Sequence, residues 1–149
     1  MTTLQNRVQE LTADQSWQLV REAQVGRMAV VVEGAPDIFP VNHTVDHGSV
    51  VFRTTVGTKL SAAVGNRVAY EVDGFDAPTG QAWSVVVKGM AREVRQLHEL
   101  MEIVDLPVFP WQEGPKPKFV RIEADEVTGR RFVVRAPAGE TAPPRSATE

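Results

Sequence analysis

The stretch "FRTTVGTKLSAAVGN", residues 52–66, changes from a strand pattern to a helix pattern at a single turn. Its first residues are aromatic or β-branched, whereas Leu60, Ala63 and Val64 recur at helical spacing. Lys59 stands where this helix would begin, and a cation there is unfavourable beside the positive end of the helix dipole. A bound phosphate would reverse that preference, because free backbone N–H groups at the start of a helix bind anions.

Arg53, Thr54 and Thr58 supply further donors for such a phosphate site. Arginine can donate two hydrogen bonds to a phosphate, and the hydroxyl groups can add more. The alternative is a solvated basic turn in which Thr58 only caps the helix. The turn is not a P-loop, because Phe52 stands where that motif requires glycine. The residues of this segment leave both interpretations open.

The composition is that of one globular domain. The chain has 149 residues, of which 42% are hydrophobic and 23% charged, and its net charge of −3 argues against a nucleic-acid partner. It has no cysteine, which excludes disulfides and thiolate chemistry and fits a reducing cytosol. No apolar run approaches the ~20 residues of a membrane span, and the start lacks the apolar core of a signal peptide. We therefore expect a cytoplasmic protein that binds neither nucleic acid nor membrane.

Short β-rich runs lie on both sides of the opening stretch. Turns rich in glycine, proline and aspartate separate them, which favours a small antiparallel barrel over βαβ units. Gly89, inside the longest run, predicts a bulge or tight bend. A capping-box pattern at Thr12 and Gln15 predicts a helix over residues 13–24. Residues 95–105 have the spacing of a second helix, with Leu97, Leu100, Met101 and Val104 on its apolar side. The β-rich runs cover residues 27–33, 38–46, 49–55, 67–73, 83–94 and 118–134.

Two further segments are candidates for contact with a planar ligand. Pro40 has no backbone N–H to donate to a neighbouring strand, so it belongs at a sheet edge or a bulge. There, nearby backbone groups and the Asn42 side chain could form hydrogen bonds with a planar heterocycle. Alternatively, Asn42 satisfies its own turn. Trp83 and Trp111 could lie near a ring-shaped ligand or serve the core and subunit contacts.

Acid–base and metal chemistry find little support in the sequence. The three histidines do not share a helix face, so we expect no metal site and no Ser/His/Asp arrangement. The carboxylates Glu71, Asp73 and Asp76 are most simply a solvated rim.

Together, these segments resemble the pyridoxamine 5′-phosphate oxidase-like proteins, the FMN-binding split-barrel family, from about Val25 to Phe132. Within the family, the likeness is to small actinobacterial-type and nitroimidazole-resistance-like members. The resemblance implies a mainly β fold: a split β-barrel of about six to seven antiparallel strands with short decorating helices. It also implies a homodimer with a flavin in each of two clefts between the subunits. The segments that carry it are "VGRMAVV", "IFPVNHTVD", "VVFRTTVGTKLSAAVGN", "VAYEVD", "WSVVVKGMAREV" and "PKPKFVRIEADEVTGRRF".

The resemblance also assigns residues to the cofactor. The strand and turn of the opening stretch would hold the FMN phosphate and ribityl chain, and the "PVN" segment would lie along the ring. The strand that begins at Trp83 would reach the ring, from the same subunit or from the other one, and Trp111 would lie in a loop over the cleft. The implied cofactor-binding residues are Pro40, Val41, Asn42, Arg53, Thr54, Thr58, Lys59, Trp83, Ser84 and Trp111.

The resemblance implies an FMN-dependent oxidoreductase acting on a small molecule, with no dedicated catalytic residue. The oxidases of vitamin B6 carry a C-terminal Arg-x-His segment, whereas this chain reads "GRRF" there, which argues against that activity. Two alternatives stay open: a reductase of the same fold that uses a deazaflavin coenzyme, and a flavin-binding module without turnover. Residues 1–135 would form the single domain, and residues 136–149, without large apolar side chains, a disordered tail.

Overall fold

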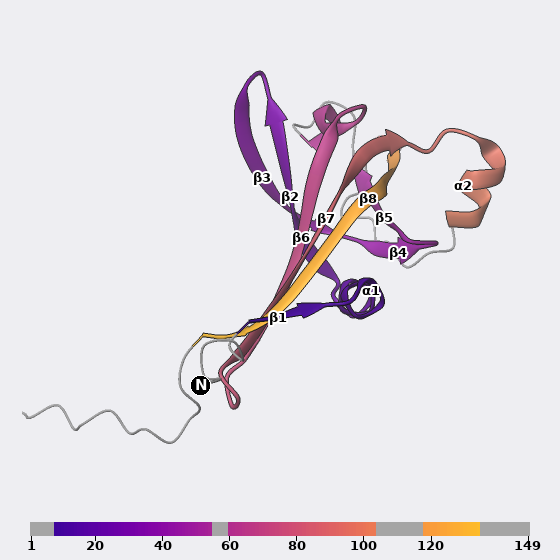
Figure 1. The fold of residues 1–149 in the computed structure, drawn as a ribbon. Coiled ribbons are helices and arrows are strands. Elements are labelled where there is room, and N and C mark those ends of the chain that lie inside the picture. The colour runs from indigo at the N-terminus through magenta and orange to yellow at the C-terminus, as the bar shows by residue number, and fades with distance from the viewer. Residues whose placement is uncertain (1–7, 55–59, 104–117, 135–149) are drawn as a thin grey trace, which may run out of the picture.

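The computed structural model describes residues 8–54, 60–103 and 118–134, and these form one curled antiparallel sheet with eight strands (Figure 1). The strand order is β3-β2-β6-β7-β8-β5-β4, and β1 pairs with the remaining edge of β8. The mainly β, split-barrel prediction is confirmed. The elements are β1 (Val8–Leu11), α1 (Ala13–Glu22), β2 (Val25–Val32), β3 (Ala35–Asn42), β4 (Thr44–Asp46), β5 (Ser49–Thr54), the 3₁₀ helix η2 (Leu60–Ala63), β6 (Arg67–Asp76), β7 (Gln81–Glu93), α2 (Leu97–Ile103) and β8 (Lys118–Val133).

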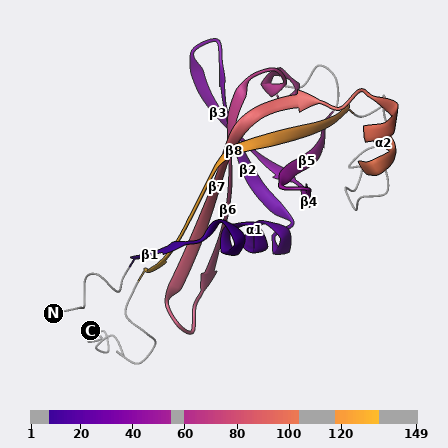
Figure 2. The ribbon, with the colours of Figure 1, turned by 45° about the vertical axis from the view of Figure 1, so that its right-hand side comes forward.

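The strand number exceeds the predicted six to seven for two reasons. The run predicted over residues 38–46 divides at His43 into β3 and β4, and β1 was not predicted at all. β3 and β4 lie at opposite ends of the strand order, although His43 alone separates them in the chain. The sheet must therefore curl until its two ends meet at His43 (Figure 2).

The strands alternate between a core face and an outward face. Tyr70, Phe52 and Met28 are the largest fully buried side chains, and they belong to one apolar cluster. Gly26 makes room for Tyr70, since a Cβ on Gly26 would lie 2.5 Å from the tyrosine ring. Helix α1 contributes Val20, which is fully buried in the same cluster.

The turns, the helix cap and the bulge that short sequence patterns predict are confirmed. Glu33 and Gly34 have φ angles of 51° and 78°, the left-handed pair of a type I′ hairpin. Thr12 caps α1, with reciprocal hydrogen bonds to Gln15 of 2.9 and 3.1 Å. The register shifts between Lys88 and Gly89, so the predicted bulge is present. A Cβ on Gly89 would lie 1.8 Å from a backbone oxygen, which explains the glycine.

Helix α2 begins close to the predicted position but turns a different side to the sheet. Leu97 and Met101, expected on the apolar side, are 73% and 66% exposed, while Ile103 is buried. The Glu99 carboxylate faces the sheet instead, where it accepts hydrogen bonds from Arg92 and Arg121. These ionic contacts and the packing of Leu100 and Ile103 against Val51 and Val94 together set the rotation of the helix.

Among residues 8–54, 60–103 and 118–134, no helix is both long and apolar enough to cross a membrane. Within those ranges, no group of three histidine or acidic side chains is arranged to hold a metal ion.

Candidate functional site

The strand that precedes the predicted phosphate turn presents Arg53 on the outward face. Its guanidinium carbon lies 5.0 Å from the centre of the Phe119 ring on β8, a cation–π contact. Thr54 faces the other way, with Phe52, and is 6% exposed. The two predicted phosphate ligands of β5 therefore project to opposite faces of the sheet.

The remaining predicted ligands of the turn, Thr58 and Lys59, lie outside the described residues, as does Trp111. The helix predicted to follow Lys59 is a 3₁₀ helix of four residues. Gly65, with φ 86°, follows this segment. Because so short a helix has only a small dipole, a phosphate here would depend on the cationic and hydroxyl side chains.

The outward face of the sheet carries three of the predicted ring contacts, on β3 and on β7, with β2 and β6 between them. Pro40 pairs with Arg27 on β2, and Arg27 in turn pairs with Glu71 on β6. Pro40, Asn42 and Ser84 have the outward parity of their strands, whereas Val41 is 7% exposed on the core face. The sheet thus brings Pro40, Asn42 and Ser84 to one surface.

An ionic cluster occupies the middle of this surface, between β3 and β7. One Arg27 amino group lies 2.6 Å from Glu71 and 2.8 Å from Asp73. Burial raises the pKa of Glu71, the hydrogen bond from Arg27 opposes that shift, and the Asp73 carboxylate adds to it. The sequence pattern predicts a solvated rim for these carboxylates and does not single out Arg27. The spacing of two between Glu71 and Asp73 on a strand was the available signal for a shared face.

Trp83 lies on the core face, so its indole does not share the outward surface with Ser84. It packs against Gly74, where a Cβ would lie 2.5 Å from the indole nitrogen. Of the two interpretations of Trp83, the position favours the core contact.

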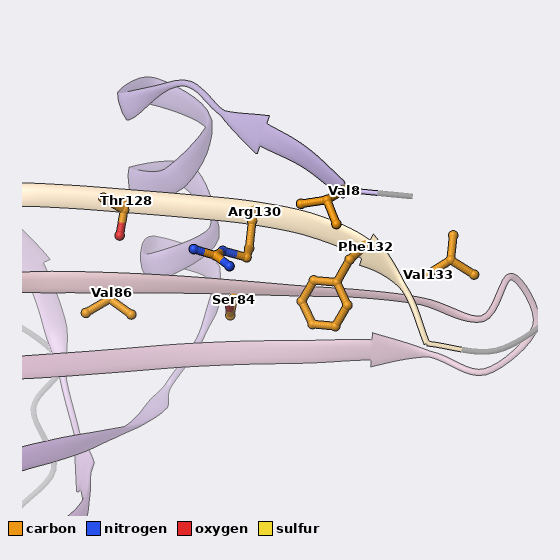
Figure 3. A pocket seen from close by; sticks show the side chains of 7 residues that line it. All are labelled: Val8, Ser84, Val86, Thr128, Arg130, Phe132 and Val133. Atoms are coloured by element: carbon orange, nitrogen blue, oxygen red, sulfur yellow. The ribbon is translucent and has the colours of Figure 1, made fainter. Parts of the chain in front are cut away.

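A hollow of about 690 Å³ opens at the far end of the same outward face (Figure 3). Arg130 on β8 reaches across it toward β7, where Ser84 is its cross-strand neighbour. Phe119, beside Arg53, lies eleven residues before Arg130 on β8, which is roughly 35 Å of strand. The lining residues are Val8, Ser84, Val86, Thr128, Arg130, Phe132 and Val133.

Comparison with known proteins shows consistent similarity over most of the chain. Residues 12–131 match the family described as pyridoxamine 5′-phosphate oxidase. An uncharacterized protein of Mycobacterium tuberculosis is 37% identical over 132 residues, which cover 85% of this chain and 86% of that protein. The structure of the FAD binding protein from Mycobacterium smegmatis has a TM-score of 0.79 at 38% identity, covering 85% of this chain and 100% of that one. A conserved protein of unknown function from Corynebacterium diphtheriae gives 0.74 at 36% identity, covering 85% and 99%.

Proposed function

Because the chain belongs to the pyridoxamine 5′-phosphate oxidase family, we propose that it is a flavin-dependent oxidoreductase acting on a small molecule. The flavin binds in a cleft formed by two copies of the chain. The observation that carries this proposal is the division of the outward face: a cationic position at Arg53 and an open hollow at Arg130 lie at opposite ends of β8.

The separation of these two features supports a site shared between subunits. In one copy, roughly 35 Å of strand separates the two features along β8, so a site that used both within one copy would have to follow most of that strand. A two-fold dimer that joins outward faces in opposite directions brings Arg53 of one copy to the hollow of the second. The exposed apolar side chains Val25, Val31 and Ile38, at 48%, 65% and 61%, give that face the character of an interface.

The described residues fit a flavin nucleotide. Arg53 provides a planar donor suited to phosphate. β3 ends the strand order, and β2 is its partner among the described strands, so its outer edge offers backbone donors and acceptors near Asn42. A flavin ring system requires both kinds of group along one edge. When bound, the flavin supplies the electron transfer, while Arg53, Asn42 and Ser84 bind and orient it.

FMN is the cofactor that the family resemblance implies. FAD is the second candidate, favoured by the relative from Mycobacterium smegmatis, which is named as a FAD binding protein and is 38% identical. Both nucleotides place a phosphate on the ribityl chain, so Arg53 serves either.

The absorbance spectrum of the purified protein tests the proposal. We expect two flavin bands, release of the flavin on heating, and identification of FMN or FAD by chromatography. Oxidation of NADH or NADPH by the coloured protein would distinguish the oxidoreductase from a binding module. A released deazaflavin, or a colourless protein that takes up neither FMN nor FAD, would overturn the flavin assignment.

A further inference from the structure

We propose that the buried pair of Tyr70 and His43 positions the outer edge of β3 at Asn42 for the flavin ring, and that it does so only while the His43 imidazole is neutral. This rests on the proposed function in one respect, because it takes that edge as a contact of the flavin. Tyr70 and His43 are positioning residues, since both are buried behind the edge that they hold.

Asn42 lies between two residues that are anchored on the β2 side of β3. The backbone N–H of His43 donates to the Gln24 carbonyl at 3.1 Å. Val41 pairs with Gly26 on β2. Because the backbone groups of successive residues in a strand point to opposite sides, those of Asn42 point away from β2, toward the outer edge. The positions of Val41 and His43 therefore decide where Asn42 presents its N–H and C=O groups.

Tyr70 links both of these residues to β6. Its hydroxyl lies 3.0 Å from the Val41 carbonyl and 2.5 Å from His43 Nδ1, so its one hydrogen serves either acceptor. The Tyr70 and His43 rings meet edge to face, with their centres 5.0 Å apart. On the other side of the imidazole, Nε2 donates to the Val20 carbonyl of α1 at 2.8 Å. His43 is thereby held between β6 and α1 at the point where β3 ends.

The surroundings of His43 suit a neutral imidazole. Burial lowers its pKa and raises the pKa of Tyr70, the titratable side chain that faces it. In the described parts of the chain, no carboxylate forms an ion pair with His43. Charged side chains on the surrounding elements are exposed or paired with other residues: Arg27 on β2, Glu71 and Asp73 on β6, Asp46 on β4, and Arg21 and Glu22 on α1.

Proton uptake at His43 should weaken flavin binding. We expect the protonated ring to leave its site and to displace Asn42 with it, because a buried cation without a counter-charge is strongly disfavoured. By linkage, a bound flavin should in turn lower the pKa of His43. The flavin affinity should be complete above the ordinary histidine pKa of 6.5 and fall as the pH drops through the folded-state value.

Titration of the flavin-free protein with FMN and FAD between pH 5 and about 8, followed by flavin fluorescence, tests the inference. The FMN phosphate itself titrates near pH ~6, so each variant is compared with the unaltered protein in the same flavin. Tyr70→Phe keeps the ring in the core and should weaken flavin binding roughly three- to tenfold at the upper end of this range. His43→Gln cannot titrate and should remove the loss of affinity in acid.

Two variants are matched controls. Ser16→Ala removes another buried hydroxyl, on the core side of α1, and His98→Gln removes an exposed histidine of α2. Both should leave the flavin affinity and its pH profile unchanged. Circular dichroism of each variant over the same pH range verifies that it is folded.

NMR titration of the His43 imidazole in the unaltered protein tests the linkage without a substitution in the pair, since bound flavin should lower its pKa. Each of three results would overturn the inference: flavin affinity in Tyr70→Phe equal to that of the unaltered protein, an unchanged pH profile in His43→Gln, or a His43 pKa that flavin does not lower.

An unaltered protein that takes up neither FMN nor FAD would end the proposed function. The positioning is then measured in the flavin-free protein, from the His43 amide that donates to Gln24. This amide should exchange roughly tenfold faster in Tyr70→Phe than in Ser16→Ala. Equal exchange in the two variants would overturn the positioning as well.

Discussion

Arg53 is the residue on which the proposed cofactor site depends most directly. In Arg53→Ala, we expect flavin affinity to fall roughly ten- to a hundred-fold, because a charge-assisted hydrogen bond of about 1.5–3 kcal/mol is lost. Lys59→Ala tests the second predicted cation in the same way. Titration of the flavin-free protein with FMN and FAD, followed by flavin fluorescence, measures the effect. Arg95→Ala, which removes a 78% exposed arginine elsewhere, is the charge-matched control. Unchanged affinity in both site variants would remove the phosphate site.

The buried His43 side chain makes the stability of the fold depend on pH. Burial lowers its pKa, although the hydrogen bond to the Val20 carbonyl opposes the shift. Because that carbonyl can only accept, His43 Nε2 donates to it at 2.8 Å. The Tyr70 hydroxyl has one hydrogen for two acceptors, the Val41 carbonyl at 3.0 Å and His43 Nδ1 at 2.5 Å. Because burial disfavours the charged form, the neutral imidazole suits the fold.

Below the ordinary histidine pKa of 6.5, the unfolded chain binds a proton that the folded chain resists. We expect the free energy of unfolding contributed by His43 to be complete above that pH and to fall as the pH drops toward the folded-state pKa. Urea unfolding between pH 5 and about 8 measures this dependence. His43→Gln removes the titrating group and should flatten the profile in this window. An equally steep profile in the variant would contradict the assignment.

At the scale of elements, signals contained within a few residues predicted the structure well. The Thr12 capping box and the bulge at Gly89 each depend on local geometry, and each is confirmed. The sequence could not predict β1, because Val8–Leu11 becomes a strand only by pairing with β8, more than a hundred residues away. Of the side predicted to be buried on α2, Leu100 packs against the apolar cluster but Leu97 and Met101 are exposed, because contacts with distant strands orient that helix.

The position of α2 depends on Glu99. Its carboxylate accepts two hydrogen bonds from Arg92, of 2.6 and 3.1 Å, and one from Arg121 at 3.2 Å. Arg121 is 7% exposed, so losing a partner there leaves a charge poorly solvated. We expect Glu99→Gln to lower the free energy of unfolding by about 1–3 kcal/mol and to speed amide exchange in α2.

The same contact has a pH signature. The hydrogen bond from Arg92 lowers the pKa of Glu99, so its contribution to stability is present above the ordinary value of 4.5 and is lost as the pH falls through the folded-state pKa. Hydrogen exchange of α2 at pH 7 and in acid measures both effects. Glu102→Gln, an exposed position on the same helix, is the control. Equal exchange in the two variants would show that Glu99 does not hold α2.

At the scale of the whole molecule, sequence patterns identified candidate segments but not their spatial relation. They named Arg53 and Ser84 as cofactor-binding candidates, and both have the outward parity of their strands, β5 and β7. They did not reveal that the two lie toward opposite ends of the β8 ladder, or that Arg27 joins Glu71 and Asp73 between the ring-contact strands. Those facts follow from strand order and register, which arise from the curl of the entire sheet.

The proposed dimer can be tested with variants that should keep the chain folded but lose both association and flavin binding. Val31→Glu and Ile38→Glu each place a charge on the exposed apolar face of the β2–β3 hairpin, where Val31 and Ile38 are 65% and 61% exposed. Each single chain should stay folded, because neither side chain belongs to the core. A buried, unpaired carboxylate in the interface should move the protein from dimer to monomer, and the flavin should be lost in parallel.

Light scattering and flavin absorbance over a range of protein concentrations measure the two effects together. Leu97→Glu adds the same charge at a 73% exposed position on α2 and should leave both mass and flavin content unchanged. A monomeric variant that keeps its flavin at undiminished affinity would show that one copy contains the complete site. In one chain, roughly 35 Å of strand lies between Arg53 and the hollow. That result would therefore also show that the hollow is not part of the flavin site.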